Sequence, residues 1–323
     1  MKPNFFSYAT NELSQDAFFC WLIEWSLEYN KKENQQLHIA SLDFLKNIIP
    51  EEFNNEFTVE SCKIQMQKKK TDFIVEINKS IIIHFEDKIK SNTNDHQLSK
   101  YKIALNTLYP NHRIYHIYLK TDLVWPNEKK IVLENDYRLI DLLTITSIIK
   151  NNKTSSDIYD NFILNIHERI NEYKNYKSIN PKKWNSDQWI GYLYDLSRKV
   201  KYCNFDRHYV GEDFWFVFSW QKIKHFKESY VSFEIVNKKC AIKAHVYNQS
   251  TSKIEVLNYV KNQLKSYFKG YKTKLYNRPG KSVLAIEFFD FLVIDNKVVN
   301  FIETKQKLLE IREIFDEAIN NVG

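Results

Sequence analysis

Two charged side chains at the end of an apolar stretch are the residues best suited to chemistry. The stretch IIIHFEDK, residues 81–88, ends in Glu86 and Lys88. Because side chains alternate along a strand, these two project from the same face. Carboxylates hold Mg²⁺ through oxygen ligands, and the metal polarises a phosphodiester and activates water. A nearby lysine orients or deprotonates that water and stabilises the charge of the transition state. The pair thus supplies two of the residue types that phosphodiester hydrolysis uses.

A second carboxylate, Asp72, comes at the start of the preceding strand. A tight turn at residues 78–80 joins the two strands as a hairpin, which can bring Asp72 beside Glu86. The Glu-x-Lys spacing alone is not specific, because the chain repeats it elsewhere. The repeats are Glu128–Lys130, Glu172–Lys174 and Glu303–Lys305. Glu86 differs from these repeats in its context. An aspartate on the hairpin partner strand precedes it, and a helix that carries a glutamine follows it.

That following helix is expected from about His96 to Leu108. Gln97 and Tyr101 are four residues apart, so they share a face of the helix. Both can contact phosphates or the active-site carboxylates. His84 lies on the face of Glu86, one pleat deeper, where a packed neutral histidine is expected rather than a ligand.

The segment KTDFIVEINKSIIIHFEDKIKSNTNDHQLSKY resembles the PD-(D/E)XK nuclease superfamily, and most closely its RecB-like branch with a QxxxY motif. The resemblance covers residues 5–120. It implies a restriction-endonuclease-like core in which Asp72 and Glu86 bind Mg²⁺ or Mn²⁺. Lys88 would be the catalytic lysine, and Gln97 and Tyr101 would position the phosphate.

The N-terminal segment ELSQDAFFCWLIEW resembles the first helix of one bacterial branch of this superfamily. In such folds an acid of the first helix often joins the metal site. Glu12 is therefore the expected further metal ligand, and Asp16 is the alternative. The sequence departs from the motif at Thr71, which replaces a proline, and at Asp87, where this branch often has asparagine. Alternation directs Asp87 away from the metal.

Hydrophobic periodicity predicts the order α-β-β-β-α-β at the N-terminal side. The expected elements are helices at residues 11–29 and 34–47, strands at 57–67, 71–77 and 81–89, a helix at 96–108 and a strand at 113–119. A helix between the last two strands implies a parallel crossover, and so a mixed sheet covered on both faces. Further helices are expected at 139–150 and 155–176. The non-periodic segment SINPKK then divides an α/β nuclease-like domain, 1–180, from a C-terminal α+β domain, 181–323.

The C-terminal domain holds the basic excess of the chain. Residues 181–290 contain 20 Lys and Arg against 10 Asp and Glu, whereas the rest of the chain contains 27 and 30. A polyanionic partner would explain this excess, and so would a solvated basic surface. A predicted helix at 254–269 would carry a stripe of Lys261, Lys265 and Lys269. Aromatic residues such as Trp215 and Trp220 lie among the lysines, which suits base stacking, although an aromatic core under a solvated lysine face fits equally well.

Several classes of protein are disfavoured. The four cysteines show no CxxC spacing, which argues against a zinc site. The N-terminus lacks the apolar stretch of a signal peptide, and no apolar run is long enough for a membrane span. We expect a cytoplasmic protein that does not bind membranes.

The sequence thus predicts a Mg²⁺- or Mn²⁺-dependent deoxyribonuclease acting in bacterial defence or DNA repair. The expected partner is nucleic acid, with DNA favoured over RNA. Many such nucleases form homodimers. Two alternatives stay open: a non-catalytic nucleic-acid-binding module on the same scaffold, and a subunit of a larger defence complex. The choice between DNA and RNA, the strandedness of the substrate and the choice between exo and endo cleavage also stay open.

Overall fold

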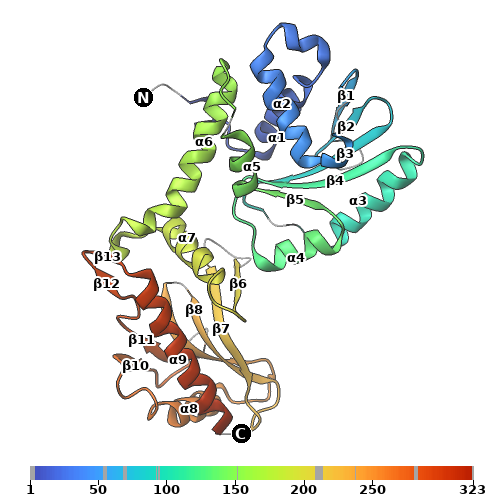
Figure 1. Cartoon of the computed structure of the whole chain (residues 1–323). Helices are drawn as coiled ribbons and strands as arrows, with labels where there is room; N and C mark the ends of the chain where they lie inside the picture. The colour runs from blue at the N-terminus through green and yellow to red at the C-terminus, as the bar shows by residue number, and fades with distance from the viewer. Residues whose placement is uncertain are drawn as a thin grey trace. The chain divides into compact units, whose positions relative to one another are not determined.

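Figure 1 shows the computed structural model of the chain, which describes residues 4–53, 57–67, 71–91, 93, 95–150, 152–207, 214–236, 238–279 and 283–321. The chain is mixed α/β and divides into two compact units, Met1–Ile170 and Asn171–Gly323. The division falls inside helix α6 (Asp157–Lys174), whereas the sequence placed it in the non-periodic segment after that helix. Each unit has its own main sheet.

The first unit contains a five-stranded mixed sheet in the order β1-β2-β3-β4-β5. Its strands are β1 Cys62–Met66, β2 Phe73–Ile77, β3 Ile81–Lys88, β4 Arg113–Lys120 and β5 Arg138–Asp141. The pairs β1–β2 and β2–β3 are antiparallel, whereas β3–β4 and β4–β5 are parallel. The four strands expected from the sequence are present, and the prediction of a mixed sheet is confirmed.

Helices cover both faces of this sheet, as Figure 1 shows. Besides α6 they are α1 Glu12–Glu24, α2 Gln35–Ile48, α3 Asp95–Leu108, α4 Pro126–Glu134 and α5 Leu142–Ile149. α3 joins β3 to β4 and is the crossover that a parallel pair requires. On one face Leu105 of α3 packs against Ile74 and Ile82, and on the other Gln15 of α1 contacts Asp87. Because the sheet is covered on both faces, every residue of β3 is buried.

The prediction of a helix at residues 139–150 is wrong for its first residues. Arg138–Asp141 forms β5 at the edge of the sheet, and α5 begins only at Leu142. Asp141 Oδ1 accepts a hydrogen bond from the backbone N–H of Thr144 at 2.8 Å and so caps α5. The strand and the helix together form one apolar run, so periodicity alone could not separate them. The short helix α4 was not predicted.

The second unit contains a six-stranded antiparallel sheet in the order β10-β11-β9-β8-β7-β6. Its strands are β6 Asn204–Arg207, β7 Phe214–Lys222, β8 Ser229–Val236, β9 Lys239–Val246, β10 Thr273–Leu275 and β11 Val283–Phe288. A separate ladder pairs β12 Ile294–Asp295 with β13 Val298–Val299. The helices are α7 Ser186–Ser197, α8 Lys253–Leu264 and α9 Phe301–Asn321. Among the residues described in either unit, no helix is long and apolar enough to cross a membrane.

Two features of this unit differ from the predictions. The apolar runs at residues 283–294 and 297–302 predict a second hairpin, but only the short β12–β13 ladder forms there, because β11 pairs with β9 and β10. The helix expected to reach Lys269 ends at Leu264. Beyond it the chain turns so that Phe268 packs against Phe288 of β11, with ring centroids 5.1 Å apart. Lys261, Lys265 and Lys269 therefore do not form a continuous helical stripe.

Gly191 marks a close approach between α7 and the backbone at the end of α6. A Cβ atom at this position would stand 1.9 Å from the carbonyl oxygen of Tyr173. Backbone atoms cannot move aside as a flexible side chain can, so only glycine allows α7 to pack here.

We therefore predict that Gly191→Ala destabilises the protein by about 2 kcal/mol or more, because the added methyl group overpacks a backbone contact. Urea unfolding followed by circular dichroism measures the change. Gly270→Ala is the matched control, because a Cβ at Gly270 meets no heavy atom within 4 Å. Equal losses of stability in the two variants would contradict the explanation.

Candidate active site

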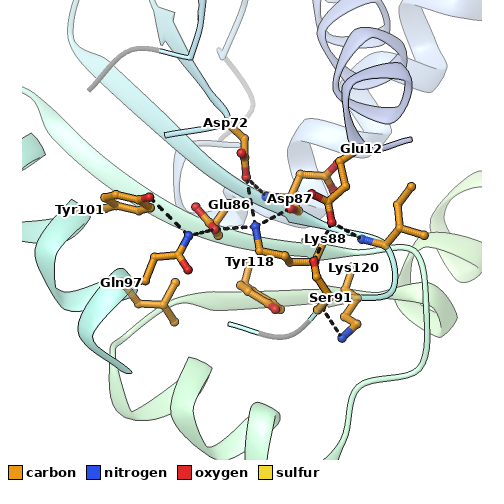
Figure 2. Close-up of polar contacts among 12 residues, drawn as sticks. Glu12, Asp72, Glu86, Asp87, Lys88, Ser91, Gln97, Tyr101, Tyr118 and Lys120 are labelled. Carbon is orange, nitrogen blue, oxygen red and sulfur yellow. Dashed lines mark hydrogen bonds and ion pairs between the residues drawn. The ribbon is translucent and has the colours of Figure 1, made fainter. Parts of the chain in front are cut away.

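The end of β3 brings three of the predicted site residues together, as Figure 2 shows. The ammonium nitrogen of Lys88 lies 2.6 Å from Glu86 Oε1 and 3.6 Å from Asp72 Oδ2. It also donates to the main-chain oxygen of Asp87 at 2.9 Å. Asp72 immediately precedes β2 and accepts a 2.7 Å hydrogen bond from the backbone N–H of Asp87. The β2–β3 hairpin thus places Asp72 next to Lys88 and Glu86.

Two residues of α3 extend this cluster. Gln97 Nε2 donates a 2.6 Å hydrogen bond to Glu86 Oε1 and another, at 3.3 Å, to the hydroxyl oxygen of Tyr101. The two side chains are one turn apart on the helix, so α3 presents both toward Glu86 (Figure 2). Burial and the charge of Glu86 raise the pKa of Tyr101, so its hydroxyl is neutral and can donate a hydrogen bond.

The charges in this cluster are buried and compensate one another. Burial raises the pKa of Glu86 to about 7, even though the Lys88 ammonium acts in the opposite direction. Burial also raises the pKa of Asp72, and Lys88 again offsets part of the rise. For Lys88 itself burial favours a lower pKa, but the carboxylates of Glu86 and Asp72 outweigh it and raise the pKa above its usual value. Lys88 is therefore an ammonium at neutral pH, and Glu86 holds its proton up to about pH 7.

The carboxyl oxygens of Asp72 and Glu86 fit a hard divalent cation. Carboxylates are the ligands that Mg²⁺ and Mn²⁺ prefer. Glu86 Oε2 is buried without a hydrogen-bond partner among the described residues, so it is an acceptor that a cation would satisfy. Among all residues that the structure describes, no three His, Cys, Asp or Glu side chains are grouped closely enough to hold a metal.

Glu12, the further ligand expected from the sequence, lies at the start of α1. Its Oε1 accepts hydrogen bonds from the hydroxyl of Ser91 at 2.7 Å and from the backbone N–H of Ile89 at 3.3 Å. The carboxylate therefore ties α1 to the segment after β3, and its role as a metal ligand stays a prediction. Its charge still reaches the cluster, because it contributes to the raised pKa of Asp72.

A second acidic pair, which the sequence analysis did not predict, lies behind the cluster. Asp87 points away from Glu86, as alternation predicts, but it is fully buried and meets α1. There Gln15 donates to its carboxylate. Burial, then the charge of Asp72, raises the pKa of the buried Asp16 to about 7. Burial, then Asp16, raises the pKa of Asp87 well above its usual value. Two buried carboxyls of this kind share a proton at neutral pH.

The signal for this pair was present in the sequence. Asp87 interrupts an apolar strand at a position whose neighbours on the same face, Ile83 and Phe85, are fully buried. An acid at such a position needs a partner from the covering helix. Asp16, the alternative metal ligand, serves as that partner.

A buried ion pair lies beside the cluster at the end of β4. Lys120 stands opposite Lys88 in the parallel register, and its ammonium lies 2.6 and 2.7 Å from the two oxygens of Glu128. Lys120 also donates to the carbonyl of Ser91 at 3.1 Å, and Tyr118 donates to Glu128 Oε1 at 2.6 Å. Each lysine thus has its own carboxylate. In the sequence Glu128 is recognisable only as part of a repeat of the Glu-x-Lys spacing.

His84 lies on the face of Glu86, deeper in the sheet. It is fully buried, and its Nδ1 lies 3.1 Å from Nδ1 of His116 on β4. Burial and the neighbouring His116 lower the pKa of His84 well below its usual value. It is therefore a packed neutral histidine, as the sequence predicted.

Comparison of the chain with protein-family models, with curated proteins and with solved structures found no significant match. The resemblance to the PD-(D/E)XK superfamily therefore depends on the motif residues and on their arrangement alone.

We predict that Asp16→Asn stabilises the protein at neutral pH. The folded state holds the protons of Asp16 and Asp87 more tightly than the unfolded state does. Stability therefore falls as the pH rises from 3.8 through about 7. Asparagine cannot ionise, so the fall becomes shallower and the free energy of unfolding at pH 8 rises by about 1 kcal/mol or more.

Urea unfolding at pH 5 and pH 8, in the presence of a chelator, measures this effect. Asp160→Asn is the control, because Asp160 is an exposed aspartate on α6 of the same unit. A variant at Asp16 with the same pH dependence as the wild type would show that the buried acid pair does not hold a proton.

Proposed function

We propose that the chain is a Mg²⁺- or Mn²⁺-dependent nuclease that hydrolyses DNA phosphodiester bonds. The observation that carries the proposal is the meeting of Asp72, Glu86 and Lys88 at the end of β3. Other copies of the Glu-x-Lys spacing lack this setting. Glu303 and Lys305, for example, lie on helix α9, where residues two apart do not share a face.

The sheet topology also supports the proposal. A restriction-endonuclease-like αβββαβ core, which the PD-(D/E)XK resemblance implies, needs three antiparallel strands, a crossover helix and a parallel fourth strand. The first unit has α1, then β1 to β3 as an antiparallel meander, then α3, then β4 parallel to β3. The QxxxY pair on α3 faces the carboxylate of the motif strand.

In this proposal Asp72 and Glu86 hold the metal ion, which supplies a Lewis acid that polarises the phosphate. Lys88, as an ammonium, donates hydrogen bonds to the attacking water and to a phosphate oxygen, and so stabilises the charge of the transition state. Its raised pKa favours this role over accepting the proton of the water. Gln97 fixes the orientation of Glu86, and the Tyr101 hydroxyl donates to the phosphate.

A second candidate is a non-catalytic nucleic-acid-binding module, or a subunit of a defence complex, on the same scaffold. The observation in its favour is that the ammonium of Lys88 already pairs with the carboxyl groups of both Glu86 and Asp72. In this candidate the ion pair is structural, and metal is not required for binding.

Cleavage assays separate the two candidates. We expect the wild type to cut plasmid or oligonucleotide DNA with Mg²⁺ or Mn²⁺, and Glu86→Gln and Lys88→Ala each to lower the rate about 100-fold or more. Glu303→Gln and Lys305→Ala, at the same spacing on α9, are the matched controls and should keep the wild-type rate. DNA binding without cleavage of any DNA form would favour the second candidate, and cleavage of RNA alone would make the proposed substrate wrong.

The raised pKa of Glu86 predicts a pH-dependent metal affinity. A protonated carboxyl does not bind a cation, so binding requires Glu86 to lose a proton that it holds up to about pH 7. Affinity for Mn²⁺ should therefore rise about tenfold between pH 6 and pH 8. Calorimetric titration at the two pH values measures it, with Glu86→Gln as the control. An affinity that does not vary over this range would show that Glu86 is not a ligand.

A further inference from the structure

The main sheet of the second unit has one face packed against helices. On that face Phe233 of β8 contacts Phe315 of α9, and Phe288 of β11 contacts Phe268 after α8. Their neighbours along the strands point to the opposite face. That opposite face carries a group of five rings, which we call the aromatic face. Its members are Trp215, Trp220, Tyr230, His245 and Tyr247.

The rings of the aromatic face form a continuous row across β7, β8 and the end of β9. Trp220 lies at its centre, with ring-centroid distances of 4.3 Å to His245, 5.9 Å to Tyr230 and 5.8 Å to Trp215. Tyr230 in turn lies 6.0 Å from Tyr247, which is 62% exposed. Trp215, Trp220, Tyr230 and His245 are partly exposed as well.

A buried carboxylate fixes two of these rings from beneath. Glu234 is fully buried and accepts hydrogen bonds from the indole N–H of Trp215 at 2.8 Å and from Ser232 at 2.7 Å. Ser232 is also 2.8 Å from Nε2 of His245. Lys243 lies 2.9 Å from the other oxygen of Glu234. Burial favours a higher pKa for Glu234, but His245, Lys243 and Trp215 lower it to about 2. The carboxylate therefore stays charged and holds two rings in place.

The charges around the aromatic face suit an anionic ligand. The buried carboxylate of Glu234 is neutralised by Lys243, and Glu287 on the same face lies 3.3 Å from Lys239. Lys222, which is exposed, stands opposite Tyr230 in register. Residues 171–323 contain 26 Lys and Arg against 17 Asp and Glu. A polyanion would therefore meet a net positive unit and two acids that are already paired.

We propose that the aromatic face binds single-stranded DNA, with bases stacked on its rings and phosphates near its lysines. The inference rests on the proposed function and names the form of substrate that the nuclease would take. Unpaired bases can lie flat on aromatic rings, whereas the bases of a duplex are stacked on one another and out of reach. Rings already fixed by Glu234 lose little conformational freedom when a base stacks on them.

Binding of DNA to the full-length Glu86→Gln variant tests this proposal. A chelator removes metal, so neither cleavage nor metal binding is needed for the measurement. The probe is a fluorescently labelled oligo-dT of about 15 nucleotides, long enough to span one such surface. Fluorescence anisotropy reports its binding, with a duplex of the same length and oligo-U as comparisons. We expect the single-stranded DNA to bind more tightly than the duplex and at least as tightly as the RNA.

Substitutions then locate the site. Trp220→Leu and Tyr247→Leu each remove a ring but keep an apolar side chain, and each should weaken oligo-dT binding roughly 5- to 100-fold. Trp220→Phe, which keeps a ring, should retain most of the affinity. Tyr267→Leu is the matched control, because Tyr267 is an exposed tyrosine just after α8. If Trp220→Leu does not fold, the exposed Tyr247 decides the question.

Unchanged binding by the ring variants, tighter binding of the duplex, or binding of RNA alone would each overturn the proposal. The outcome is separate from that of the nuclease proposal. If the wild type never cuts DNA but its oligo-dT binding depends on the rings, the nuclease proposal is wrong and the proposal for the aromatic face stands. Cleavage of DNA with ring-independent binding would do the reverse.

Discussion

The ammonium of Lys88 between the buried carboxyl of Glu86 and the half-buried carboxyl of Asp72 is the interaction on which the rest of the first unit depends. A carboxyl as buried as Glu86 is costly to ionise unless a positive charge lies beside it. Lys88 supplies that charge from the same strand, and Asp72 reaches it only because β2 and β3 form a tight hairpin. α3 must then run over this face, because Gln97 gives Glu86 a neutral donor.

The same constraint recurs around the cluster. Lys120 stands next to Lys88 on the adjacent strand, and two ammonium groups so placed would repel each other if they shared one carboxylate. The first turn of α4 therefore brings Glu128 to Lys120 and not to Lys88. On the other face, burial and neighbouring acids raise the pKa values of Asp16 and Asp87, which favours their protonated forms. The first unit thus combines acids that pair with a lysine and acids whose protonated forms are favoured by burial.

The elements predicted correctly from the sequence are those whose apolar residues recur with one clear period. β2, β3 and α3 follow their alternation or their helical spacing, so the relation of Asp72, Glu86, Lys88 and Gln97 could be inferred before any coordinates. The errors arise where long-range pairing decides. β5 lies in an apolar run that is continuous with α5, and β11 pairs with β9 rather than with its neighbour in sequence. The position of Glu12 depends on the loop after β3, for which no local pattern exists.

The Lys120–Glu128 pair also bears on how the protein can change in evolution. Both side chains are almost completely buried, at 1% and 2% exposed. Loss of either one would leave a buried charge without its opposite charge, at a cost of about 3–5 kcal/mol. The free energy of unfolding of a typical domain is roughly 5–15 kcal/mol, so this cost is a large part of it. The two positions are therefore expected to covary among homologous chains, with an apolar residue tolerated at one only where the other has also become uncharged.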